Sequence, residues 1–266
     1  MLGLGLSISS GSVSSGFSPE DISNLTLWLA VNKNITSDQS KTSVSHSHST
    51  AADNMGDEDK INAWNAFGST SINAEQTTTA DKPIWTTDAA DIGGLDFTTG
   101  GKYTDLSTQI DLSEDTDFTI AIRLKCTDYG AGRAFLGKAA GEFIRFSNNT
   151  TVRLKLDNVN RDFALSSGTF ATDKYLTLII VRSDAATSNI NIYVRGADSG
   201  YFDGTAAGTQ VGSQLQDDAE VTITDLGSAA NDIQNFIGII KDVLIYNGTA
   251  VSSSQREALF DYIEAN

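Results

Sequence analysis

Several segments of the chain place apolar residues at every second position, which is the pattern of a β-strand with one face on a core. Two segments show it most clearly, one beginning at Phe118 and one at Thr151. The first alternates Phe118, Ile120, Ile122 and Leu124 with Thr119, Ala121, Arg123 and Lys125, and the second alternates Val152, Leu154 and Leu156 with Thr151, Arg153 and Lys155. Each of these strands is therefore expected to have one face toward solvent.

Two further segments, Tyr175–Arg182 and Gly238–Tyr246, are apolar at nearly every position. Continuous apolar runs of this length indicate strands that are buried on both faces, so both are expected in the interior of a sheet. Ile190, Ile192 and Val194 supply a hairpin partner for the first. Together the strands predict an all-β fold in which two antiparallel sheets pack face to face as a sandwich.

A short helix is predicted at the C-terminus, from Ser252 to about Glu264. Ser252 and Gln255 have the spacing of a capping box, in which each side chain accepts a hydrogen bond from the other residue's backbone N–H. One stripe of the helix is apolar and is expected to close over the end of a sheet, while the charged residues stay in solvent. The stripe contains Ala258, Leu259, Tyr262 and Ile263, and the charged residues are Arg256, Glu257, Asp261 and Glu264.

The first sixteen residues, Met1–Gly16, contain only small, polar and aliphatic residues and carry no charged side chain. Their composition is typical of an extended arm that precedes a single domain, residues 17–266. The arm alternates Leu2, Leu4, Leu6 and Ile8 with the period of a strand, so it is predicted to pair with the sheet edge of a neighbouring subunit. The alternative is an arm folded back along its own domain.

After the arm, Ser18 and Pro19 favour one helical turn through Asn24, and Leu25–Leu29 is expected to be a strand. The stretch Thr36–Asp91 is polar and weakly patterned. We interpret it as long loops held on the sandwich by Trp64, Phe67, Ile84 and Trp85.

The net charge of −16 is unevenly distributed. From Thr36 to Asp117 there are 15 Asp and Glu residues against 4 Lys and no Arg, a net charge of −11. Such a surface repels a nucleic-acid backbone, so nucleic-acid binding is not expected. Clustered carboxylates serve either solubility or the binding of a divalent cation such as Ca²⁺.

Residue types that carry catalysis are sparse. Cys126 ends a strand and is expected to be a buried small residue, and His46 and His48 are expected to belong to a polar loop. A retaining glycosidase needs two carboxyl groups about 5 Å apart. Glu114, Asp115 and Asp117 come nearest but precede a strand, and Glu142 and Glu220 lack a partner at the second position after them. We therefore expect a protein without enzymatic activity.

The chain has no run of about twenty apolar residues, so membrane insertion is not expected. Its first residues lack the positive and long apolar regions of a signal peptide. We therefore expect a protein made in the cytoplasm of its host that leaves by lysis or in an assembled particle.

Five segments share their order with one known family. They are FSPEDISNLTLWL from Phe17, KPIW from Lys82, LDFTTGGKYTDLS from Leu95, TLIIVRSDAATSNINIYVRG from Thr177 and GIIKDVLIYNGTAVSSSQREALFDYI from Gly238. The ordered set resembles the laminin-G-like, concanavalin A-like jelly rolls found in phage virion and bacterial surface proteins. The resemblance implies an antiparallel jelly-roll sandwich that recognises carbohydrate or protein at one rim, often with calcium.

Carried onto this sequence, the resemblance suggests three calcium ligands, Asp157, Asn158 and Asn160, with Asp105 or Asp111 from the acidic segment. The alternative for Asp157 and the two asparagines is that they only form a turn. Three aromatic residues are candidates for stacking on a sugar, namely Tyr103, Tyr129 and Tyr201. Three tryptophans, Trp28, Trp64 and Trp85, are expected in the core or as loop anchors.

Two functions are compatible with these features. The first is a non-catalytic virion structural protein, a capsid decoration, knob or fibre component, which binds other virion proteins or copies of itself through its arm and displays the jelly roll to surface glycans. The alternative is a free bacterial carbohydrate-binding module.

Overall fold

The computed structural model describes residues 16–30, 35–37, 60–86, 93–113, 116–130, 132–165, 169–183, 189–196, 209–215, 220–230 and 234–265. The predicted arm with Leu2, Leu4, Leu6 and Ile8 lies outside the described residues, as do Tyr201, His46, His48, Glu114 and Asp115.

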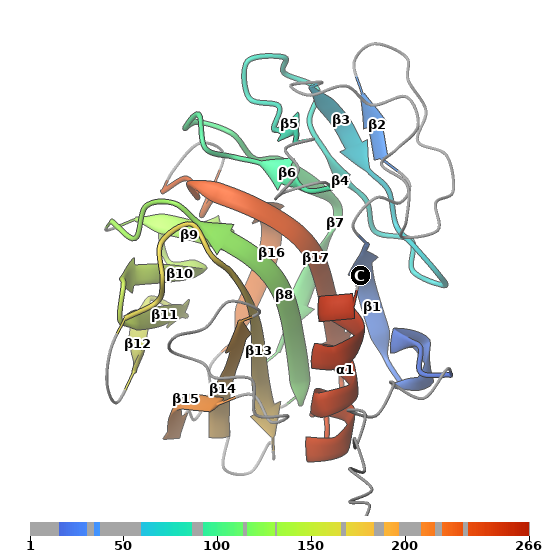
Figure 1. The fold of residues 1–266 in the computed structure, drawn as a ribbon, viewed down its shortest axis with the longest axis vertical. Coiled ribbons are helices and arrows are strands. Elements are labelled where there is room, and N and C mark those ends of the chain that lie inside the picture. The colour runs from blue at the N-terminus through green and yellow to red at the C-terminus, as the bar shows by residue number, and fades with distance from the viewer. Residues whose placement is uncertain are drawn as a thin grey trace, which may run out of the picture.

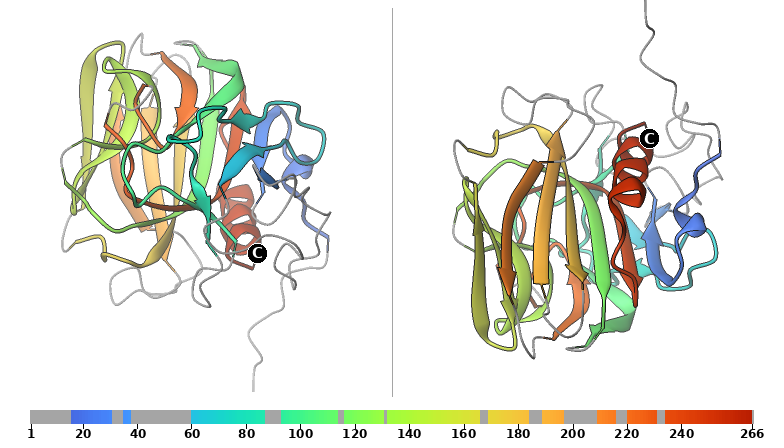
Figure 2. Two further views of the ribbon diagram at one scale, coloured as in Figure 1. Left: turned by 90° about the horizontal axis from the view of Figure 1, so that it is seen from above. Right: turned by 90° about the horizontal axis from the view of Figure 1, so that it is seen from below.

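Two antiparallel sheets form the body of the protein, which confirms the predicted sandwich (Figures 1 and 2). Sheet A has the strand order β15-β14-β13-β8-β17-β6-β5, and β1 also pairs with β17. Its strands are β1 (Leu25–Leu29), β5 (Ile84–Trp85), β6 (Leu95–Asp96), β8 (Phe118–Cys126), β13 (Tyr175–Ser183), β14 (Asn189–Gly196), β15 (Thr209–Leu215) and β17 (Gly238–Asn247). The two nearly continuous apolar segments, β13 and β17, are interior strands of this sheet, as predicted.

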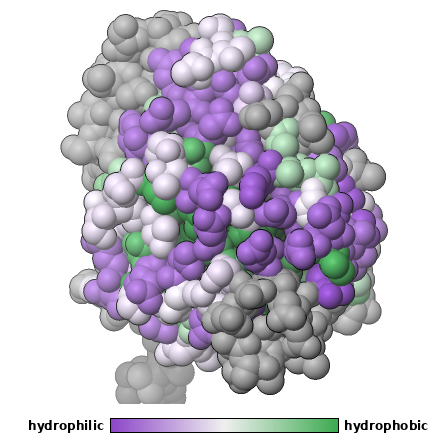
Figure 3. Space-filling view, turned by 180° about the vertical axis from the view of Figure 1, so that it is seen from behind, coloured by the Kyte–Doolittle hydropathy of each residue, from purple (hydrophilic) through white to green (hydrophobic). Residues whose placement is uncertain are grey.

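Sheet B has the strand order β12-β11-β10-β9-β16-β7-β4-β3-β2. Its strands are β2 (Ile35–Ser37), β3 (Ile61–Trp64), β4 (Ala74–Glu75), β7 (Thr104–Leu112), β9 (Arg133–Ala139), β10 (Glu142–Asn148), β11 (Thr151–Leu156), β12 (Val159–Ala164) and β16 (Val221–Leu226). The outer face of sheet B lies at the back of the molecule in the view of Figure 1, which is the side that Figure 3 displays.

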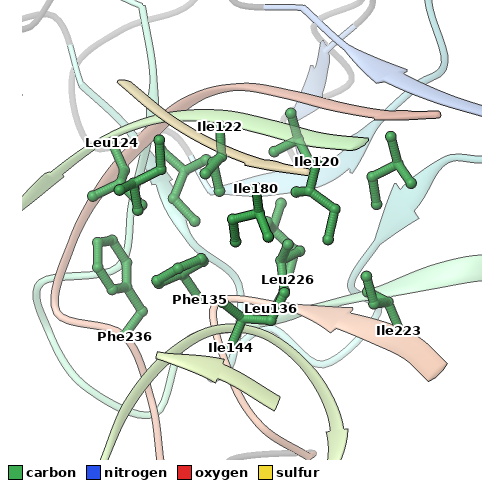
Figure 4. Packing of buried hydrophobic residues seen from close by; sticks show 14 of the residues in the cluster. Ile120, Ile122, Leu124, Phe135, Leu136, Ile144, Ile180, Ile223, Leu226 and Phe236 are labelled. Carbon is green, nitrogen blue, oxygen red and sulfur yellow. The ribbon is translucent and has the colours of Figure 1, made fainter. Parts of the chain in front are cut away.

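The core lies between the two sheets (Figure 4). Ile120, Ile122 and Leu124 point from β8 toward Leu136 and Ile144 of sheet B, and all are fully buried. Burying side chains of this size stabilises the fold by about 1.5–3 kcal/mol each, before the cost in conformational entropy. The inward alternation predicted for β8 and β11 is confirmed.

The expectation that β8 is wet on its other face is wrong for its first half. Thr119 and Ala121 are fully buried. Ala121 belongs to a second apolar cluster on the outer face of sheet A, and the hydroxyl of Thr119 is hydrogen-bonded to the backbone of Thr249 and Val251 in the turn before the C-terminal helix. The cluster contains Ile22, Trp28, Ala30, Ala121, Ile179, Val181, Leu244, Tyr246, Val251, Leu259, Phe260 and Ile263. Its last three residues come from the C-terminal helix α1 (Ser253–Ala265), so the helix covers the outer face of the sheet.

The predicted capping box of α1 is confirmed. Ser252 donates its backbone N–H to Gln255 Oε1 at 2.9 Å, and Gln255 donates its own to Ser252 Oγ at 3.3 Å. These bonds satisfy two backbone N–H groups at the start of the helix.

The expectation that the charged residues of α1 stay in solvent is only partly right, because all four are half-exposed and also contact sheet A. Arg195 of β14 binds Asp261 at 2.6 Å, Glu257 at 2.9 Å and Glu264 at 3.5 Å, and its guanidinium lies 4.6 Å from the ring centroid of Phe260. The remaining charged residue, Arg256, lies over the ring of Tyr193. These side chains attach the helix to sheet A while remaining partly exposed to water.

At the N-terminal side, Ser18 caps a single helical turn, Pro19–Asp21, which Tyr246 Oη holds by donating to Pro19 O at 3.1 Å. The strand predicted at Leu25–Leu29 is confirmed as β1.

The interpretation of Thr36–Asp91 as loops is wrong for four short strands, while the other described residues of this stretch are turns and irregular backbone, as expected. Short strands β2, β3 and β4 extend sheet B there, and β5 joins sheet A. Trp64 and Trp85 are fully buried and Trp28 nearly so, in agreement with their expected place in the core. In the part of the chain that is described, no helix has the length and apolar character needed to cross a bilayer.

Candidate functional site

The side of the molecule that carries the outer face of sheet B is largely hydrophilic, with apolar residues near its middle (Figure 3). On β7, Leu106, Ile110 and Leu112 point into the core while Asp105 and Asp111 are exposed. Among the described residues, no helix packs on this face as α1 does on sheet A. Side chains projecting from rigid strands keep their positions better than side chains on loops, which suits a binding face.

A short segment after β16 lies over β9 in the middle of this face. Ala134, Phe143 and Ala229 form a small apolar cluster there, and Ala134 donates its backbone N–H to Gln234 O at 2.8 Å. Gly137 permits the close approach, because a Cβ at this position would lie 2.7 Å from Ala229 Cα. The segment separates an acidic half, on β16 and β7, from a basic half, on β10 and β11.

The acidic half is centred on two carboxyl groups. Asp105 of β7 and Asp225 of β16 are directly opposite in the sheet, and their side chains share a hydrogen bond. Burial, this hydrogen bond and the charge of Asp225 raise the pKa of Asp105 to about 6. Asp225 is buried and also accepts from Thr224 Oγ1 at 2.6 Å. The pair therefore holds a proton at a pH where separate aspartates are ionised.

Tyr103 lies directly before β7, two residues ahead of Asp105 in the chain. Its side chain is hydrogen-bonded to Gln76, and partial burial raises its pKa. Gln76 also donates through Nε2 to the backbone oxygen of Tyr103 at 3.3 Å. Tyr103 is thus half-buried and lies close in the chain to Asp105 of the acidic pair.

The basic half is centred on two arginines. Arg145 of β10 and Arg153 of β11 are directly opposite, and Arg153 in turn faces Asp162 of β12. Arg153 makes a bidentate ion pair with Asp162, with both nitrogen to oxygen distances at 2.6 Å. This pairing lowers the pKa of Asp162. Arg145 instead lies over the ring of Phe143, 4.6 Å from the ring centroid.

The three candidate calcium ligands lie at the hairpin turn between β11 and β12, at the edge of sheet B. Asp157 and Asn158 adopt positive φ angles of 42° and 65°, and Asn158 donates its backbone N–H to Gly141 O at 3.1 Å. Asn160 is exposed on β12, opposite Lys155. Asp and Asn tolerate this left-handed backbone well, which accounts for the first two residues as turn formers.

Asp105 and Asp111 are not close to that turn, because β11, β10, β9 and β16 lie between β12 and β7. Within the described residues there is no group of three or more His, Cys, Asp or Glu side chains arranged to hold a metal ion. The structure therefore does not bring the sequence candidates together into one cation site.

Tyr129, predicted as an exposed aromatic, is instead buried. Its ring packs against Phe146, with ring centroids 4.9 Å apart, and its hydroxyl donates to Ala171 O at 3.2 Å. It therefore has no exposed ring face for a sugar. The tyrosine simply belongs to the core at the end of the sandwich.

Cys126 is fully buried, as predicted, and burial raises the pKa of its thiol to about 12. Glu142 accepts a hydrogen bond from the backbone N–H of Thr222 at 2.9 Å and lies 3.9 Å from Lys138. The side chains of Cys126 and Glu142 therefore serve the packing and hydrogen bonding of the fold. Glu220 is exposed and precedes β16, and Asp117 precedes β8.

Sequence reasoning missed Asp225 and Arg145. It also missed the arginine row, the three residues Arg145, Arg153 and Asp162 that lie opposite one another on β10, β11 and β12. Asp225 is an acidic residue at the end of an apolar strand, which was a usable signal. The opposite positions of Arg145 and Arg153 follow from the turn between β10 and β11, at Asn148–Thr151.

Solved structures similar in fold to this chain include two arabinofuranosidases. A GH54 α-L-arabinofuranosidase matches with a TM-score of 0.59 at 12% identity, over 89% of this chain and 62% of that one. An arabinofuranosidase complexed with arabinofuranosyl-α-1,2-xylobiose matches with a TM-score of 0.55 at 13% identity, over 77% of this chain and 51% of that one. The chain thus spans between half and two thirds of the length of these enzymes.

No curated protein matches the sequence. Residues 98–255 match the family Laminin_G_3, described as the concanavalin A-like lectin/glucanases superfamily. The match begins just before β7 and ends in the first turn of α1, so it includes β8, β13 and β17 at the centre of sheet A and most of sheet B. With this match over more than half of its length, the chain belongs to the concanavalin A-like lectin/glucanase superfamily.

Proposed function

We propose that this protein is a non-catalytic carbohydrate-binding jelly roll that holds a glycan on the outer face of sheet B. The observation that carries the proposal is the polar face itself, on which charged and hydroxyl side chains project from strands of a packed sandwich. Sugars are recognised by donors and acceptors held in fixed positions, and strands supply that rigidity. Membership of a lectin and glucanase superfamily supports the proposal.

The geometry of the carboxyl pair favours binding over hydrolysis. Retaining glycosidases place their two carboxyl groups about 5 Å apart and inverting enzymes about 6.5–9.5 Å apart. Asp105 and Asp225 instead share a hydrogen bond. A pair in direct contact shares its proton and leaves no room for a glycosidic bond between the two groups.

A glycan array with the purified protein tests the proposal. Arabinofuranosyl-xylobiose belongs on it, because one protein of similar fold was solved with that oligosaccharide. We expect binding to at least one glycan without release of reducing ends on prolonged incubation. The proposal is wrong if no glycan binds, and its non-catalytic part is wrong if bound oligosaccharide is cleaved.

Calcium dependence is a second readout of the same array. We propose the β11–β12 turn as the place for a cation if binding needs one, since Asp157, Asn158 and Asn160 present oxygen atoms there. Binding that is lost in EDTA, restored by Ca²⁺ and abolished in Asp157→Ala would support this site. Binding that persists in EDTA would reject it.

We further propose that the jelly roll is displayed on a phage particle through residues 1–16, bound to other virion proteins or to copies of itself. Support comes from the resemblance to phage proteins and from the uncharged alternation of Leu2, Leu4, Leu6 and Ile8. Deletion of residues 1–16 should leave a folded protein that no longer joins particles. Unchanged incorporation would reject the role of this segment, and a protein absent from particles altogether would favour the free bacterial carbohydrate-binding module.

A further inference from the structure

The strands around the basic half, β9 to β12, carry more cations than carboxylates. Counted over both faces, residues Arg133 to Ala164 contain six Lys and Arg residues against three Asp and Glu, a net charge of +3 in a chain whose net charge is −16. Within this half, Arg145 and Arg153 stand directly opposite on neighbouring strands. Like charges in opposite positions destabilise a sheet unless an anion lies near them.

One carboxylate serves these two guanidinium groups. Arg153 takes both oxygens of Asp162, with each distance at 2.6 Å. Arg145 donates from Nη1 to the neutral side-chain oxygen of Gln234 at 2.6 Å and lies over the ring of Phe143. Among the described residues, no carboxylate forms an ion pair with Arg145.

Arg145 is also partly removed from water. Its Nε atom is buried without a hydrogen-bond partner, as is Oγ of Ser147, two residues farther along the same face of β10. Burial first, and then the charge of Arg153, lowers the pKa of Arg145. A half-desolvated cation with a neutral partner gains more from an incoming anion than a fully hydrated surface arginine does.

We propose that Arg145 is the anion-recognition residue of the glycan site, so that the saccharides bound by this protein carry a carboxylate or sulfate group. The guanidinium is planar and presents a fork of N–H donors that matches the two oxygens of either group. Phe143 and Gln234 fix its orientation. The net positive charge of strands β9 to β12 also favours the approach of an acidic chain. The inference rests on the glycan-binding function proposed above.

The test is calorimetric titration with trigalacturonate, its methyl ester, dextran sulfate and dextran, all in EDTA. The methyl ester keeps the sugar backbone and removes the charge, while the two dextrans do the same for sulfate. We expect binding of at least one charged member of a pair and no measurable binding of its neutral counterpart. Preference for one charged member identifies the anionic group.

Arg145→Met removes the guanidinium and keeps the aliphatic part of the side chain, so it should weaken binding of the charged ligand about tenfold or more. Arg145→Gln is the second variant, because an amide retains a donor for Gln234 and protects the fold. Arg161→Met is the matched control. It removes the same charge from the opposite face of β12, since Arg161 pairs with the inward-facing Leu154, and should leave affinity nearly unchanged.

The outcomes separate this inference from the function on which it rests. Equal loss in the Arg145 and Arg161 variants would show a general charge effect and overturn the assignment of Arg145. Binding to neutral glycans alone would overturn the anionic specificity and leave the glycan-binding function intact. Silence with every saccharide, here and on the array, would overturn both.

Discussion

The proton held between Asp105 and Asp225 makes a specific prediction for stability. In the folded protein the pKa of Asp105 is raised from 3.8 to about 6, so the folded state binds this proton more tightly than the unfolded chain does. A raised carboxyl pKa contributes stability at low pH that is lost as the pH rises through the folded value. The variant Asp105→Asn cannot ionise and should therefore become more stable relative to the wild type as the pH increases.

The magnitude follows from the shift. About two pKa units correspond to about 3 kcal/mol, and about half of this change falls between pH 5 and pH 8. Because the side chain of Asp105 is exposed, solvent screening reduces the effect further. We expect Asp105→Asn to gain about 0.5–1 kcal/mol in unfolding free energy relative to the wild type between these two pH values.

Urea denaturation of both proteins at pH 5 and pH 8 measures the gain. Asp111→Asn is the control, since Asp111 is exposed on the same face of β7 but lies opposite Thr222 rather than a carboxyl group. The control should show no comparable dependence on pH. A difference between Asp105→Asn and wild type that is the same at both pH values would refute the shared proton.

Three further predictions concern the packing of the sandwich. Arg195→Met should lower the unfolding free energy in urea by about 2 kcal/mol, because Glu257, Asp261 and Glu264 lose their common partner while partly buried; an unchanged value would show that the helix is held by its apolar residues alone. Ser252→Ala should lower the unfolding free energy by about 1 kcal/mol in the same assay, because the helix loses its cap. Ser254→Ala, at the second residue of the helix, should lower it by less. The thiol of Cys126 should resist a disulfide reagent at pH 8 until urea unfolds the protein, since it is buried and its pKa is raised to about 12; rapid labelling of the native protein would contradict this burial.

Structural features that are set by residues close together in the sequence were predictable. The strands β1, β13 and β17 follow from local runs of apolar residues, and the start of α1 follows from Ser252 and Gln255. Period-two alternation assigned the inward faces of β8 and β11 correctly, because the alternation itself records which face meets the core.

Features that depend on what covers a face were not predictable in the same way. Thr119 and Ala121 are small or polar and read as solvent residues, yet α1 and its preceding turn bury them. Thr119 shows the reason, since its hydroxyl donates to Thr249 O at 2.9 Å and accepts from Val251 N at 3.1 Å. A hydroxyl that is fully hydrogen-bonded can be buried at little cost, so its polarity alone does not report exposure.

The two halves of the candidate face differ in how far the sequence could have revealed them. Arg145, Arg153 and Asp162 lie on three successive strands joined by tight turns, so a hairpin register alone brings them together. Asp105 and Asp225 meet only because β16 is inserted between β7 and β9, with an irregularity between Ile223 and Asp225 that sets the register. A slip of one residue there would turn the Asp225 side chain toward the core, where an ionisable carboxyl is strongly disfavoured. The acidic pair is therefore a property of the tertiary register, whereas the arginine row is encoded locally and should persist in relatives that keep the β10–β12 meander.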